Sequence, residues 1–163
     1  PLRDVYKRQG REDAVLGDAL VADPNAEKLH EVVSDRADLT RRLDHFLTES
    51  ESIIPEASKA LACGDLERFG RMADESQRAA EDLLGNQVPQ TSALARIARE
   101  LGATGATSFG AGFGGSVWAL VPNAEAPEFA STWLGKYRDE YSEEAGQAVT
   151  VVTRPGPSAR RLD

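Results

Sequence analysis

The chain has few sulfur-containing and aromatic residues. Cys63 is its one cysteine, Met72 is its one methionine, and aromatic residues make up 6% of the sequence. A single cysteine excludes an internal disulfide framework and is typical of proteins of the reducing cytoplasm. The sequence also lacks a run of about 18 apolar residues, the length that a membrane-spanning helix requires. We therefore expect a cytoplasmic protein with no membrane span.

Positive charge is also in short supply. The chain has 19 Lys and Arg against 27 Asp and Glu, which gives a formal net charge of −8. Proteins that bind nucleic acids neutralise phosphates with clustered basic side chains. The charge balance therefore predicts no nucleic-acid partner.

The two histidines lack the neighbours that metal sites and hydrolytic enzymes require. His45 shares a predicted helix face with Glu49, four residues on, and we predict a structural role for it. His30 has no partner pattern. No second His or Cys lies at ligand spacing, and no Ser/His/Asp or Cys/His arrangement is recognisable. We therefore predict no metal site and no catalytic residue within this chain.

Glycine, by contrast, is concentrated in one place. The run Phe109–Ser116 holds four glycines among eight residues and leads directly into the apolar segment Val117–Val121, which predicts a buried strand. A P-loop would need a lysine and a following helix, and a dinucleotide-binding loop would also have to open a helix. Both are excluded by the order of loop and strand. Two interpretations stay open: a tight turn that serves packing, and a loop whose exposed peptide N–H groups face an anion.

The rest of the sequence predicts helices first and a small sheet afterwards. Apolar residues at helical spacing predict helices over about 24–47, 53–63, 65–84, 89–101 and 127–144. Ser50 or Ser52 is the predicted cap of the second, Asp65 is the predicted cap of the third, and Gly85 with Asn86 is its predicted stop. The last predicted helix has an aromatic residue at every fourth position, which we interpret as its buried face. Residues 103–109 are extended at best, and residues 116–121 and 147–153 are predicted strands. This order favours an α+β fold.

Four ordered blocks resemble galactokinases of the GHMP kinase superfamily. The family's third motif is similar to Gly105–Val117, and its Arg-x-x-His-x-x-x-Glu helix is similar to Arg42–Glu49. Gly64–Gln77 resembles the family segment in which Gly-Asp is followed by Phe-Gly, Met and Ser-His. Pro89–Thr91 occupies the place of the family's Cys-Pro-Glu. The sequence departs from the family at four of these positions: Gln77 for His, Thr107 for Arg, Phe109 for Thr and Ser116 for Cys. These departures put the exact sugar in doubt.

The resemblance implies a fold, a partition of the chain and a site. Residues 23–163 would be a GHMP kinase C-terminal domain, with helices on one face of a small antiparallel, ferredoxin-like sheet. Residues 1–22 would be a remnant or linker, and the N-terminal domain that mainly binds ATP, Mg²⁺ and sugar would be missing. The glycine loop would support the phosphate-binding loop of that domain; its residues are Gly110, Ala111, Gly112, Phe113, Gly114 and Gly115.

The implied activity is transfer of the ATP γ-phosphoryl group to the anomeric hydroxyl of galactose. We expect the chain by itself to be inactive, because phosphoryl transfer requires many groups at once. One alternative is another GHMP kinase that acts on a different sugar or on a non-sugar alcohol. A second is a non-catalytic galactokinase-like sensor of sugar and ATP. A third is a stand-alone interaction domain, for which the apolar face that the missing half normally covers should be exposed. A highly soluble monomer would favour this alternative.

Overall fold

The computed structural model describes residues 16–156. The helical half comes first in the chain and consists of α2 (Leu16–Ala22), α3 (Glu27–Val33), α4 (Ala37–Leu47), the π-helical η1 (Thr48–Ile53), α5 (Ile54–Cys63), α6 (Leu66–Ala79) and the π-helical η2 (Ala80–Leu84). The second half consists of α7 (Pro89–Glu100), β1 (Gly105–Phe109), β2 (Ser116–Leu120), α8 (Ala126–Glu140) and the short η3 (Ala145–Gln147). None of the described helices is both long enough and apolar enough to cross a bilayer.

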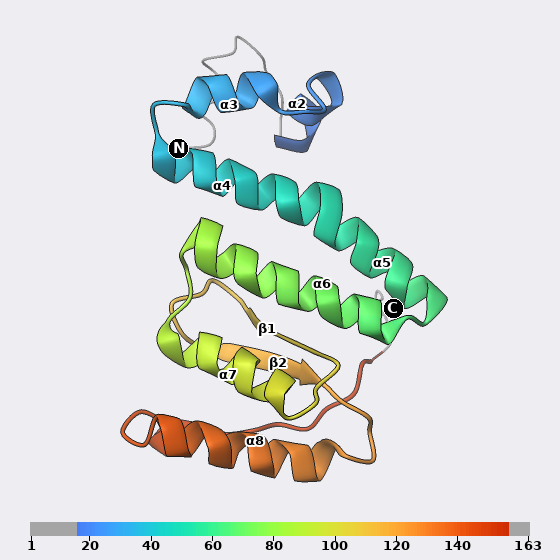
Figure 1. The fold of residues 1–163 in the computed structure, drawn as a ribbon, viewed down its shortest axis with the longest axis vertical. Helices are drawn as coiled ribbons and strands as arrows, with labels where there is room; N and C mark the ends of the chain where they lie inside the picture. The colour runs from blue at the N-terminus through green and yellow to red at the C-terminus, as the bar shows by residue number, and fades with distance from the viewer. Residues whose placement is uncertain (1–15, 157–163) are drawn as a thin grey trace, which may run out of the picture.

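The elements are stacked along one long axis (Figure 1). The α2–α3 pair lies at one end, followed by the continuous α4–α5 rod, by α6, by the sheet with α7, and by α8 at the other end. α6 contacts both α5 and β1, so it separates the helical layer from the sheet. The predicted class, α+β with helices packed against a small antiparallel sheet, is confirmed.

The sheet consists of β1 and β2, which pair antiparallel with Thr107 opposite Trp118. Successive side chains of a strand point to opposite faces, so alternate residues meet different helices. Trp118 stacks on Phe69 of α6, with their ring centroids 6.1 Å apart. Ala106 and Val117 instead belong to a cluster with residues of α7 and α8. The resemblance implied helices on one face of the sheet; in the structure α6 contacts the Trp118 side and residues of α7 and α8 contact the Ala106 and Val117 side.

α6 approaches β1 closely because Gly70 has no side chain. A Cβ atom at Gly70 would overlap the carbonyl oxygen of Thr104, the residue before β1. Glycine inside a helix is unfavourable by about 1 kcal/mol relative to alanine, so this position trades helix propensity for close packing. Gly70 therefore sets the distance between the helical layer and the sheet.

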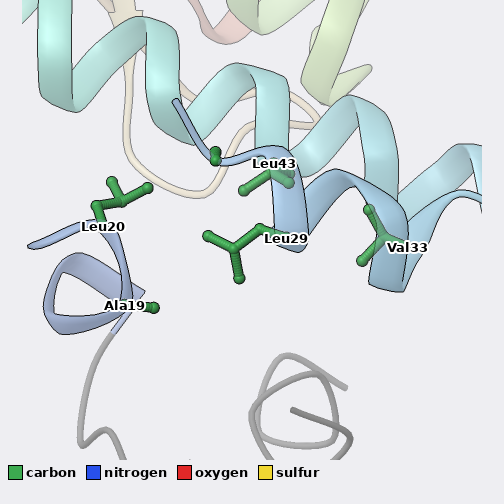
Figure 2. Close-up of a cluster of buried hydrophobic side chains, with 6 residues drawn as sticks. Ala19, Leu20, Leu29, Val33 and Leu43 are labelled. Atoms are coloured by element: carbon green, nitrogen blue, oxygen red, sulfur yellow. The ribbon is translucent and has the colours of Figure 1, made fainter. Parts of the chain in front are cut away.

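The N-terminal helices enclose a small core of their own. Figure 2 shows Ala19 and Leu20 of α2 beside Leu29, Val33 and Leu43 of α3 and α4, all of them buried. Residues 16–22, part of the span that the resemblance implied to be a remnant or linker, form α2, and Ala19 and Leu20 of this helix are buried. Residues 1–15 lie outside the described residues, and the domain boundary at residue 23 stays a prediction.

The single helix predicted over residues 24–47 is wrong, because the chain breaks into α3 and α4 at residues 34–36. Ser34 Oγ donates to the carbonyl of Glu31 at 2.8 Å, and Arg36 has a φ of −129°, outside the helical region. Such local side-chain bonds compete with the helical ladder. The apolar spacing continues across the break because α3 and α4 both bury residues in the same cluster.

The predicted start of a separate helix at residue 53 is also wrong, because α4, η1 and α5 run without a break from residue 37 to residue 63. Three signals in the later helices are confirmed. Asp65 caps α6, since its carboxylate accepts from the N–H of Arg68 at 2.9 Å. Gly85, with a φ of 63°, ends η2 in the left-handed conformation that favours glycine. The aromatic face of α8 is packed as predicted: Tyr137 is 5% exposed, and Trp133 Nε1 donates to the carbonyl of Leu94 in α7 at 2.9 Å.

The predicted strand over residues 147–153 is wrong. The segment leaves η3 as non-regular chain, and no strand pairs with it among the described residues. The side chains of Val149 and Val151 are each 80% exposed. β-branched residues favour strands mainly through packing against cross-strand neighbours, and no described strand lies beside this segment. The part of the predicted tail beyond residue 156 lies outside the described residues.

Candidate functional site: the glycine loop and its supports

The glycine loop, residues 110–115, joins β1 to β2. Its four glycines all have φ between 85° and 113°, the left-handed side of the map that side chains disfavour. Phe113 joins them with a φ of 59°, although it carries a large side chain that is 73% exposed. A non-glycine residue held there stores backbone strain of about 1 kcal/mol or more. The loop geometry therefore requires the glycines.

Asn86 contacts this loop from the junction between η2 and α7. Its carbonyl oxygen accepts from the N–H of Phe113 at 2.5 Å, and its Nδ2 donates to the carbonyl of Ala111 at 3.2 Å. A Cβ atom at Gly112 would overlap both the carbonyl and the side-chain amide of Asn86. The loop is thus packed tightly against one residue that lies about 25 positions earlier in the chain.

Sequence reasoning missed this role of Asn86. It identified Gly85 and Asn86 as a helix stop, and α6 with η2 does end there. A polar residue that follows a helix-ending glycine is normally exposed, whereas Asn86 is 9% exposed. No local pattern in the sequence distinguishes a buried asparagine from an exposed one at such a position.

The loop presents backbone N–H groups and no charged side chain. Between residues 102 and 124 the sequence contains no Asp, Glu, Lys or Arg. The N–H of Phe113 donates to the carbonyl of Asn86, whereas the N–H groups of Ala111, Gly112 and Gly114 have no acceptor among the described residues. Successive unpaired N–H groups in such conformations can bind an anion through their dipoles. The arrangement fits a phosphate, and it provides no carboxylate to bind a metal ion.

Two consecutive residues of α6, Ser76 and Gln77, connect the sequence blocks that resemble galactokinases. Ser76 Oγ donates to Glu49 Oε1 at 2.6 Å, and Glu49 lies 3.9 Å from His45 Nε2. Gln77 turns to the sheet, where Thr107 Oγ1 donates to Gln77 Oε1 at 2.9 Å. His45 of α4 therefore lies beside Glu49 of η1, which Ser76 connects to α6. The structural role of His45 stays a prediction.

His30 has partners that the sequence did not predict. Its Nε2 lies 2.7 Å from Asp44 Oδ1, and its Nδ1 lies 2.9 Å from the carbonyl oxygen of Ala26. Both ring nitrogens thus face acceptors, an arrangement that the doubly protonated ring satisfies. The hydrogen bond to Asp44 accordingly raises the pKa of His30 above its ordinary value, against a smaller opposing effect of burial. This pair joins α3 to α4.

The described residues offer no other chemical cluster of note. Residues 16–156 contain no group of three or more His, Cys, Asp and Glu side chains placed to hold a metal ion. Cys63 is free and exposed at the end of α5. The glycine loop with Asn86 is therefore the candidate site, and the six loop residues named from the sequence stay a prediction as functional residues.

Comparison with known protein families supports the resemblance at the level of the superfamily. The family model described as GHMP kinases C terminal matches residues 56–139, just over half of the 163 residues. The match begins in α5, includes α6, α7, both strands and the glycine loop, and ends in α8. The chain belongs to the GHMP kinase C-terminal domain family.

Proposed function

We propose that this chain is the C-terminal domain of a galactokinase-like sugar kinase. Membership of the family implies a small-molecule phosphotransferase as the complete protein. The galactokinase branch is favoured by the sequence Gly110–Ser116 together with the Arg42–Glu49 block. The observation that carries the proposal is the loop itself, with four left-handed glycines and unpaired N–H groups beside the buried Asn86.

The loop would contribute to the reaction by electrostatics. ATP with Mg²⁺ supplies the phosphoryl group, and the C1 hydroxyl of the sugar accepts it while ADP leaves. Negative charge spreads over the phosphate oxygens during transfer, and fixed N–H dipoles stabilise that charge without having to reorient. The described residues fit the phosphate part of ATP through backbone donors, whereas a magnesium ligand and a base for the sugar hydroxyl would come from outside this chain.

The four departures from the galactokinase pattern divide into two kinds. Gln77 and Thr107 are buried and hydrogen-bonded to each other, so each satisfies a polar group that the other brings into the interior of the domain. Phe109 and Ser116 form a cross-strand pair at the base of the loop, and both are exposed. An altered substrate, the alternative to galactose, would therefore depend on the Phe109–Ser116 pair.

The test is an assay of ADP release with Mg-ATP by the protein expressed from its complete gene. We expect turnover with galactose in a panel of sugars, mevalonate and homoserine. Gly112→Val should abolish it, because the side chain would overlap Asn86 and φ is 85° there. Gly146→Ala is the matched control, since no atom lies within 4 Å of the added Cβ and the residue is outside the loop.

Each other outcome has a definite meaning. Turnover with a different sugar or an alcohol would keep the superfamily and replace galactose. Tight binding of sugar and ATP without turnover would establish the sensor. Absence of both binding and turnover would refute the kinase and the sensor together.

A further inference from the structure

We propose that Asn86 is a positioning residue that holds the glycine loop in its phosphate-facing conformation. Asn86 binds no substrate in this proposal; it acts through the loop. The expected effect of Asn86 on ATP binding rests on the proposed function. The claim that Asn86 holds the loop rests on the contacts alone.

The loop has little means of holding itself. Glycine loses more conformational freedom on ordering than any other residue, and four of the six loop residues are glycine. The fifth left-handed residue, Phe113, is strained, with its side chain in solvent. Strained conformations persist only where their surroundings determine them. The loop therefore needs an anchor outside its own sequence.

Asn86 has the properties of such an anchor. It is 9% exposed, and its side chain is oriented from a second direction: Gln87 Nε2 donates to Asn86 Oδ1 at 2.9 Å. This leaves Nδ2 to donate to the carbonyl of Ala111, while the Asn86 carbonyl accepts from Phe113. One residue thus fixes two peptide groups that flank Gly112.

The two contacts also determine what the loop offers to a ligand. They bind the carbonyl of Ala111 and the N–H of Phe113, and they leave the N–H groups of Ala111, Gly112 and Gly114 without an acceptor within the described loop. Because Gly112 packs directly on Asn86, the loop cannot shift toward the helix junction. Loss of the Asn86 side-chain amide should therefore make the loop more mobile and weaken its binding of phosphate.

The structural test is limited chymotrypsin proteolysis of the protein expressed from its complete gene. Phe113 is exposed in the loop, and cleavage after it requires the loop to open locally. Asn86→Ala removes the amide, and Asn86→Asp removes the donor and places a carboxylate beside the Ala111 carbonyl. We expect fragments ending at Phe113 to appear at least about fivefold faster in both variants, the change expected for one net hydrogen bond. Asn123→Asp makes the same chemical change in an exposed turn and should leave the rate unchanged.

The functional test is the KM for ATP of the same variants. We expect it to rise about tenfold in Asn86→Ala, because the phosphate-facing N–H groups lose their fixed arrangement. A residue that only stabilised the fold would reduce the active fraction and hence kcat, and it would leave KM unchanged. KM therefore separates positioning from stability.

The outcomes are distinguishable. Cleavage after Phe113 at the wild-type rate in both variants would overturn the anchor. Faster cleavage with an unchanged KM for ATP would overturn the positioning role. A wild-type protein without turnover on any substrate would refute the proposed function, and the proteolysis would still decide whether Asn86 holds the loop.

Discussion

The side-chain oxygen of Gln77 accepts two hydrogen bonds from β1, one from Thr107 Oγ1 at 2.9 Å and one from the N–H of Ser108 at 2.8 Å. Its Nε2 in turn donates to Glu81 on the next turn of the helix, at 2.8 Å. A single amide of α6 thereby satisfies a backbone donor of the strand that leads into the glycine loop. Gln77 and Thr107 are both positions at which this chain departs from the galactokinase pattern, and the structure shows that they depart as a bonded pair.

We expect Gln77→Leu to destabilise the domain by about 2 kcal/mol, because it removes the acceptor of the part-buried N–H of Ser108 and the nearer of the two acceptors of the Thr107 hydroxyl. Thr107→Val removes only one donor and should cost about 1 kcal/mol or less. Urea unfolding followed by circular dichroism measures both values. Equal losses for the two variants would contradict the view that Gln77 serves two donors.

Two helical glycines should respond in opposite directions to the same substitution. Gly70→Ala should destabilise the protein by about 3 kcal/mol or more, because its methyl group would overlap the carbonyl of Thr104 and force α6 away from the strand. Gly135→Ala, inside α8 with no atom within 4 Å of the new methyl group, should stabilise it by about 1 kcal/mol. Thermal melting of the two variants tests the pair, and a Gly70→Ala protein as stable as wild type would refute the close approach.

The His30–Asp44 pair should make stability depend on pH. Because the folded pKa of His30 is raised above the ordinary 6.5, its contribution is fully present below about pH 6.5 and is lost as the pH rises through the folded pKa. The effect should be small, since the two side chains are 37% and 39% exposed. The measurement is the difference in unfolding free energy between wild type and Asp44→Asn from about pH 5.5 to 8.5. The difference should shrink toward high pH, and one that grew with pH would reverse the assignment.

The same substitution at two valines tests the corrected C-terminal segment. Val117→Ala in β2 should cost about 1 kcal/mol, because the side chain packs in the cluster with α7 and α8. Val151→Ala should change stability by less than about 0.5 kcal/mol, since that side chain is 80% exposed. Chemical denaturation gives both values. A loss at Val151 as large as at Val117 would show that the segment packs as the sequence predicted.

Sequence patterns predicted those elements whose signals are local. The Asp65 cap, the stop at Gly85 and the spacing of the aromatic residues in α8 each act within a few residues, and each is present in the structure. The errors arose where a local preference needed a distant partner. Val149 and Val151 favour a strand, but a strand also requires a neighbouring edge, and none pairs with them in the described part of the chain. At Ser34, a side-chain hydrogen bond to Glu31 ended a helix that the apolar spacing continued.

The sequence by itself determined the glycine loop, its position before a strand and the α+β class, because backbone freedom and apolar periodicity are properties of neighbouring residues. The strand was predicted to be buried, and in the structure β2 is only partly buried. The sequence also contained the ordered blocks by which the chain resembles GHMP kinases. Only the tertiary structure decided what supports the loop. Gln77 reaches β1 from within α6, and Asn86 reaches the loop from just beyond the end of η2. These contacts join positions 25 or more residues apart, and they depend on how the helical segment packs on the sheet. Packing at that range follows from the whole set of side chains, and no local pattern encodes it.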